Sequence, residues 1–89
     1  MQSHKLVVAN PRGLHTQACA RIADIANRRR CRLSLVVKGR RVSARSIVAV
    51  MLLTASVGVT LRVEADGPDE EAAMREITLL FHDGLGERS

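Results

Sequence analysis

The spacing of apolar residues changes several times along this chain, and that alternation limits the folds available to it. Strand-like runs, which are β-branched or alternate apolar with polar residues, cover 4–9, 32–38, 41–43 and 59–65. Helix-like spacing, with apolar residues three and four positions apart, covers 16–28, 47–53 and the segment from Pro68 to a stop at Gly84. The sequence therefore predicts elements in the order βαββαβα.

This order favours one architecture. Each predicted element has one apolar face, which must be buried against another layer. Helices mixed with a hairpin that turns at Gly39-Arg40 predict an α+β open-faced β-sandwich. In it, a four-stranded antiparallel sheet carries three helices on one face. Because 89 residues leave room for one modest core, we expect a single domain, residues 1–89.

The composition indicates a globular, cytoplasmic protein. Apolar residues make up 46% of the chain, and Phe81 is the one aromatic residue, so the core must be aliphatic. No apolar run approaches the roughly 18 to 20 residues that a membrane span needs. The residues that lead into the first strand lack the apolar stretch of a signal peptide. We therefore expect no membrane partner.

The two cysteines do not suggest a metal site. Cys19 and Cys31 belong to no CxxC motif and have no accompanying histidine pattern, so neither zinc nor a disulfide is indicated. Cys19 falls on a helical face and is expected to be buried, as suits a reduced compartment. We expect no cofactor, no metal and a monomer.

The charges are distributed unevenly. Residues 1–63 carry twelve lysines and arginines against one acid, Asp24, whereas residues 64–89 carry two arginines against eight acids. Such asymmetry suggests an acidic partner, either nucleic acid or a protein surface. The densest basic run, residues 28–32, is interpreted as a solvated helix end. With one aromatic residue and no recognition-helix pattern, nucleic acid is disfavoured.

His15 stands out among the three histidines by its position. It follows a glycine-containing loop and comes immediately before a predicted helix, whereas His4 and His82 are expected on the surface. The first N–H groups of a helix lack internal partners and, with the helix dipole, favour an anion. A neutral imidazole there can attack phosphorus while the amides hold the phosphoryl oxygens. The alternative is that His15 only caps the helix.

Three blocks of sequence resemble a known family. Gly13-Leu14-His15 looks like the active-site signature of HPr, the histidine phosphocarrier of the bacterial phosphotransferase system. Residues 46–53 and 64–72 are similar to its second and third blocks, in the same order and spacing. The resemblance implies that His15 accepts a phosphoryl group from enzyme I and passes it to an EIIA-type acceptor. It implies a carrier rather than an enzyme with turnover of its own.

The sequence departs from that family beside the histidine. The family usually continues with Ala-Arg, and the arginine contacts the phosphoryl oxygens, but here Thr16 and Gln17 follow. Gln17 can donate hydrogen bonds but carries no charge, and charged hydrogen bonds are roughly twice as strong as neutral ones. Thr16 can cap the helix or contact phosphate. Arg12, in the same loop as His15, is either a replacement cation or a solvated residue.

The second block suggests regulation and docking. Ser46 is a good N-cap for the helix over 47–53, and that alone explains a serine there. The resemblance implies a second role, because in some bacteria HPr kinase phosphorylates the matching serine. It also implies that Ile47, Val48, Met51 and Arg45 bind partner proteins, although ordinary core positions are the alternative.

Two further functions remain as alternatives to the active carrier. Gln17 favours a regulatory binding protein with a weakened phosphotransfer site, and the retained His15 opposes it. A small basic nucleic-acid-binding domain is the third hypothesis. The resemblance is compatible with both sugar transport and nitrogen-type regulation.

Overall fold

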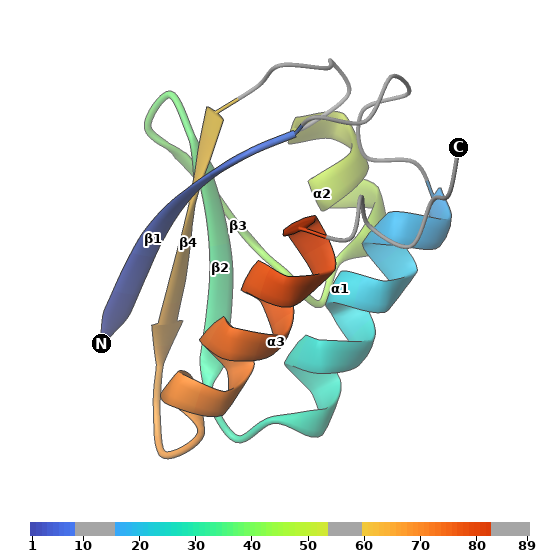
Figure 1. Cartoon of the computed structure of the whole chain (residues 1–89). Coiled ribbons are helices and arrows are strands. Elements are labelled where there is room, and N and C mark those ends of the chain that lie inside the picture. Colours follow the sequence, from blue (N-terminus) through green and yellow to red (C-terminus); the bar gives the residue numbers. More distant parts are fainter. Residues whose placement is uncertain (9–15, 54–59, 83–89) are drawn as a thin grey trace.

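The computed structural model describes residues 1–8, 16–53 and 60–82. The described residues form four strands and three helices in the predicted order (Figure 1). The strands are β1 (Gln2–Val7), β2 (Arg32–Val37), β3 (Arg40–Ser43) and β4 (Thr60–Asp66). The helices are α1 (Thr16–Arg28), α2 (Ile47–Leu53) and α3 (Glu70–His82).

The strands pair into one antiparallel sheet in the order β1-β4-β2-β3. All three helices lie on the same face of this sheet (Figure 1), which confirms the open-faced α+β sandwich. No helix of the described residues is both long and apolar enough to cross a membrane.

The core between the sheet and the helices is aliphatic, as the composition requires. Its largest fully buried side chains come from both layers: Val8, Cys19, Ile22, Leu35, Val50, Leu61, Val63, Met74 and Ile77. Helix α1 buries the predicted positions 18, 22, 25 and 26. Burial raises the pKa of the Cys19 thiol to about 11, so this cysteine stays protonated and acts as a small apolar residue.

The hairpin turn lies one residue earlier than the sequence predicted. Lys38 and Gly39 have positive φ angles of 50° and 83°, and Arg40 already belongs to β3. Tight hairpins use positive φ at both central residues because that geometry matches the twist of the strands. The glycine at position 39 predicted one of those residues, but no local sequence feature identified Lys38 as the other.

Helix α3 begins two residues later than predicted, at Glu70 rather than Pro68. The Asp69 carbonyl accepts the first helical bond from the Ala73 N–H (2.9 Å), while the Asp69 carboxylate accepts the Arg30 N–H (2.9 Å). The start of α3 is thereby fixed to the connection between α1 and β2. A side chain at Gly67 would place Cβ 2.7 Å from the Cys31 Cα, so the close approach requires glycine.

Candidate functional site

The structure describes the part of the predicted phosphorylation site that begins with α1. His15 and Arg12 lie outside the described residues, whereas Thr16 and Gln17 are the first two residues of α1 and are both exposed. The Thr16 hydroxyl donates a hydrogen bond to the Met51 sulfur at 3.5 Å. This contact joins the start of α1 to α2, although the two residues are 35 positions apart. The structure thus brings together three predicted site residues, Thr16, Gln17 and Met51.

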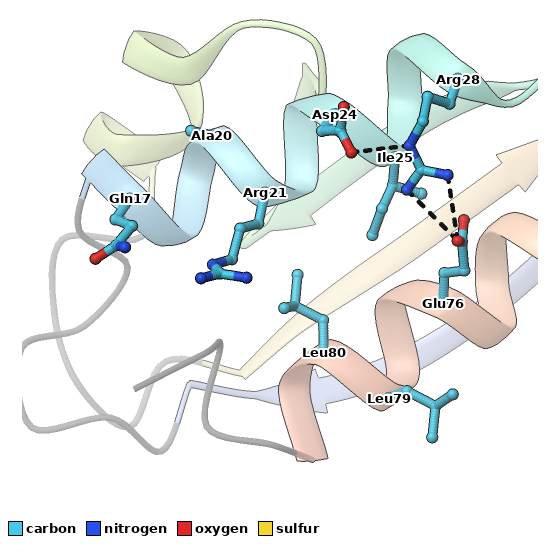
Figure 2. A pocket seen from close by; sticks show the side chains of 9 residues that line it. All are labelled: Gln17, Ala20, Arg21, Asp24, Ile25, Arg28, Glu76, Leu79 and Leu80. Carbon is cyan, nitrogen blue, oxygen red and sulfur yellow. Dashed lines mark hydrogen bonds and ion pairs between the residues drawn. The ribbon is translucent and has the colours of Figure 1, made fainter. Parts of the chain in front are cut away.

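Arg21 is a cation near this site that the sequence reasoning missed. It lies one helical turn after Gln17, and residues four apart share a helix face. Figure 2 shows both side chains along one hollow of about 600 Å³ between α1 and α3. Arg21 is exposed and forms no ion pair with any described residue. The four-residue spacing between Gln17 and Arg21 is the sequence feature that could have identified this cation.

The far end of the same hollow is closed by ion pairs. Arg28 Nε lies 2.8 Å from Asp24 Oδ2, and Arg28 Nη1 lies 3.4 Å from Glu76 Oε1 of α3 (Figure 2). Arg29 Nε reaches the other Glu76 oxygen at 2.9 Å. The hydrogen bond from Arg29 lowers the pKa of Glu76. The sequence predicted that the basic run over residues 28–32 is a solvated helix end. Part of that run is instead paired with α3.

Helix α2 is capped as predicted. Ser46 Oγ accepts the Ala49 N–H at 3.2 Å, and the Ser46 carbonyl accepts the Val50 N–H at 3.0 Å. Ser46 is exposed, so its hydroxyl is accessible from outside the protein. The exposed Arg45 precedes it and donates its backbone N–H to Ser43 Oγ at 3.2 Å.

The exposed apolar surface of α2 differs in part from the predicted one. Val48 is 66% exposed, as expected for a docking residue, but Ile47 and Met51 are partly buried against the core. Leu52, which the sequence reasoning did not select, is 78% exposed. Val48 and Leu52 are four residues apart and share one helix face. We call this pair the α2 patch.

Comparison with known proteins identifies the family. Residues 2–83 match the family model PTS-HPr, "PTS HPr component phosphorylation site". The chain is 41% identical over 87 residues to the phosphocarrier protein HPr of Xylella fastidiosa, covering 98% of both chains. It is 38% identical over 80 residues to that of Treponema pallidum, covering 90% of this chain and 91% of the relative.

A solved structure agrees with the fold. HPr from Thermoanaerobacter tengcongensis superimposes with a TM-score of 0.92 at 27% identity, and all of both chains is covered. Family model, relatives and fold coincide over nearly the whole sequence. The chain therefore belongs to the HPr family of phosphocarrier proteins of the phosphotransferase system.

Proposed function

We propose that this protein accepts a phosphoryl group on His15 from enzyme I and passes it to an EIIA-type acceptor in the cytoplasm. Membership of the HPr family carries the proposal. The position of His15, directly before the first residue of α1, supports it. An imidazole nitrogen bonds to phosphorus as the bond to the donor breaks, and the positive end of the helix dipole favours the phosphoryl oxygens.

Charge near the phosphoryl group distinguishes this chain from the usual pattern. Gln17 is neutral, so the cation must come from elsewhere if the site has one. Arg12 precedes His15 in sequence, and Arg21 lies one turn along α1 on the face of Gln17. Side chains on a helix lean toward its N-terminus, which directs Arg21 toward the start of α1. We therefore propose that Arg21, alongside or instead of Arg12, stabilises the transferred group.

Partner proteins dock on the surface formed by the α2 patch and its arginine neighbour. Val48 and Leu52 are exposed apolar residues of α2, and Arg45 is an exposed cation just before that helix. The Thr16–Met51 hydrogen bond joins this helix to the start of α1. An apolar centre beside a charge is typical of a protein interface. It suits an acidic surface on enzyme I and on the acceptor.

Ser46 is the proposed regulatory residue. Phosphorylation by an HPr kinase would place negative charge at the start of α2, where the helix dipole tolerates it. The same charge would alter the docking surface, because Ser46 directly follows Arg45. We also propose that the carrier acts as a monomer.

A chase experiment tests the carrier function. The protein is phosphorylated with enzyme I and phosphoenolpyruvate, separated from them, and mixed with an EIIA-type protein. We expect the phosphoryl group to move to the acceptor, with intact mass measured for both proteins. A phosphorylated protein that never loses its group to any EIIA-type acceptor of its own cell would exclude the carrier function.

The second candidate, a regulatory binding protein, is favoured by one observation. Gln17 removes a charged contact beside the phosphoryl group, which slows transfer. If transfer is absent while a partner still binds the α2 patch, this second function replaces the first.

A further inference from the structure

A second hollow, of about 610 Å³, lies over β2 and β3 and is separate from the site at the start of α1. Three arginines and two serines line it, together with a cysteine and a valine, and no carboxylate is among them: Cys31, Arg32, Ser34, Arg41, Val42, Ser43 and Arg45. A hollow whose charged side chains are all cationic favours an anion.

The strand register explains how the arginines come together. Ser34 of β2 lies opposite Ser43 of β3, and the Ala44 N–H donates to the Leu33 carbonyl at 2.9 Å beyond the last assigned pair. Beyond Ser43 the chain turns, with the Ser46 N–H donating to the Ser43 carbonyl at 3.1 Å, so Arg45 lies in a turn that borders the same hollow as Arg32. Both arginines line this hollow, so their positive charges act on the same space.

Neither of these two arginines is neutralised within the protein. Among the described residues, no carboxylate lies within ion-pair distance of Arg32 or Arg45. Asp66 is the β4 partner of Arg32 in the register, but its carboxylate lies 3.7 Å from the N-terminal ammonium instead. Both arginines are therefore available to pair with an anion from outside.

The third arginine is already held in place. Arg41 Nη2 lies 2.7 Å from Glu64 Oε1, and Arg62 Nε lies 3.2 Å from Glu64 Oε2. The carboxylate of Glu64 is shared between these two guanidinium groups. Glu64 is buried, with 8% of its surface exposed. Because two cations share one anion, positive charge remains in excess at the border of the hollow. The ion pair with Glu64 also fixes the position of Arg41.

The two serines supply hydroxyl donors. Ser34 is 7% exposed, and its hydroxyl forms no hydrogen bond with any described residue. The Ser34 oxygen is nonetheless accessible from outside, so its hydroxyl is available to donate to a ligand in the hollow. Ser43 Oγ accepts the Arg45 backbone N–H at 3.2 Å, so its own hydrogen remains available to donate.

We propose that this hollow, the β2–β3 pocket, binds a phosphate monoester. Two unpaired guanidinium groups and two hydroxyls offer more donors than the two oxygens of a carboxylate can use, but they suit the three terminal oxygens of a phosphate monoester. The hollow exceeds the size of a phosphate group, and Cys31 and Val42 leave space for an organic part. The monoester comes from a free metabolite or from a phosphorylated side chain of a partner protein.

Nuclear magnetic resonance titration of the full chain tests the proposal. The probes are glucose 6-phosphate, a phosphoserine peptide and the same peptide with glutamate, all at constant ionic strength. We expect saturable shifts of the Ser34 and Ser43 amides with at least one phosphate probe. The probe that binds more tightly identifies the source. Binding at the start of α1 would instead move the Thr16 and Gln17 amides.

Matched variants separate a built site from diffuse attraction. Arg32→Gln and Arg45→Gln should each weaken binding about tenfold, as expected for a lost charged hydrogen bond. Arg40→Gln removes the same charge from β3 outside the pocket and should change affinity less than about twofold. Ser34→Ala should weaken binding without lowering the melting temperature, because its hydroxyl has no partner among the described residues.

Three results would overturn the proposal. The first is no saturable shift with either phosphate probe. The second is an equal loss of affinity in Arg40→Gln and Arg32→Gln. The third is a glutamate peptide that binds as tightly as the phosphoserine peptide.

Discussion

At the scale of single residues, Ser46 has a structural role that can be separated from regulation. Its hydroxyl oxygen accepts the Ala49 N–H at 3.2 Å and satisfies one donor at the start of α2. Ser46→Ala leaves that donor without its partner and should lower the free energy of unfolding by about 1 kcal/mol, measured from the urea midpoint.

Ser46→Asp is the control, since aspartate also caps helices. It should unfold near the native midpoint yet accept phosphate from enzyme I more slowly than the native protein. An unchanged midpoint in Ser46→Ala would show that the cap contributes nothing. A normal phosphorylation rate in Ser46→Asp would remove the regulatory role.

We propose that Gln17 and Arg21 set how much positive charge lies near the phosphoryl group. Phosphoryl transfer depends on positioning and charge stabilisation, and about 1.4 kcal/mol corresponds to tenfold in rate. Restoring a cation by Gln17→Arg should speed transfer from enzyme I. If Arg21 supplies the charge, Arg21→Ala should slow transfer strongly in the native background and less in Gln17→Arg.

A double-mutant cycle measures that coupling, and the same cycle with Arg12→Ala shows which arginine acts. Arg75→Ala is a matched control, since Arg75 is an exposed α3 residue that does not line the α1–α3 hollow. Additive effects of Arg21→Ala and Gln17→Arg would mean that Arg21 is an ordinary surface residue.

At the scale of elements, α2 buries one face and exposes another. Val50 is buried, whereas Val48 and Leu52 are 66% and 78% exposed. Val48→Asp and Leu52→Asp should each weaken binding of enzyme I at least tenfold, in calorimetric titration, with little change in melting temperature. Leu79→Asp, a change at a 56% exposed residue of α3, is the control. Equal weakening by Leu79→Asp would place the interface elsewhere.

The ion pairs of Glu76 join α1 to α3 and make the stability depend on pH. Arg29 and Arg28 lower the pKa of this carboxyl from its ordinary value of 4.5. Its contribution is therefore present above pH 4.5 and is lost as the pH falls through the lower pKa of the folded state. Glu76→Gln should be slightly less stable than the native protein at pH 7, and the difference should shrink in acid. A difference in melting temperature between the two proteins that stays constant from pH 7 to pH 3 would contradict this.

Elements whose signals are local were predictable from the sequence. The bounds of α1 and α2 agree with the predicted segments 16–28 and 47–53. The signals are local, because an apolar stripe marks α1 and the capping Ser46 comes directly before α2. The start of α3 was not predictable, since it depends on the Asp69 carboxylate contacting Arg30, 39 residues away.

The candidate site shows the same limit. Thr16 and Gln17 were found from their position beside His15, but the contact of Thr16 with Met51 joins two helices. The exposure of Leu52 and the set of residues that line the α1–α3 hollow likewise depend on how the helices pack against one another. Local pattern therefore predicted residue identity at the site better than residue exposure.

At the scale of the whole molecule, much of the acidic charge in the second part of the sequence is used internally. Glu76 pairs with Arg28 and Arg29, Glu64 with Arg41 and Arg62, and Glu70 with the N-terminal ammonium at 2.8 Å. All of these pairs except Glu64–Arg62 link segments distant in sequence, so part of the asymmetry serves folding. Arg21, Arg32 and Arg45 form no ion pair with the described residues and remain for partners or ligands.

The proposed phosphorylation of His15 is tested by intact mass spectrometry. The native protein and His15→Ala are incubated with enzyme I and phosphoenolpyruvate, and each is weighed before and after mild acid. The native protein should gain one acid-labile phosphoryl group, and His15→Ala should gain none. Equal labelling of the two proteins, or no labelling of the native protein by an active enzyme I from its own cell, would contradict it.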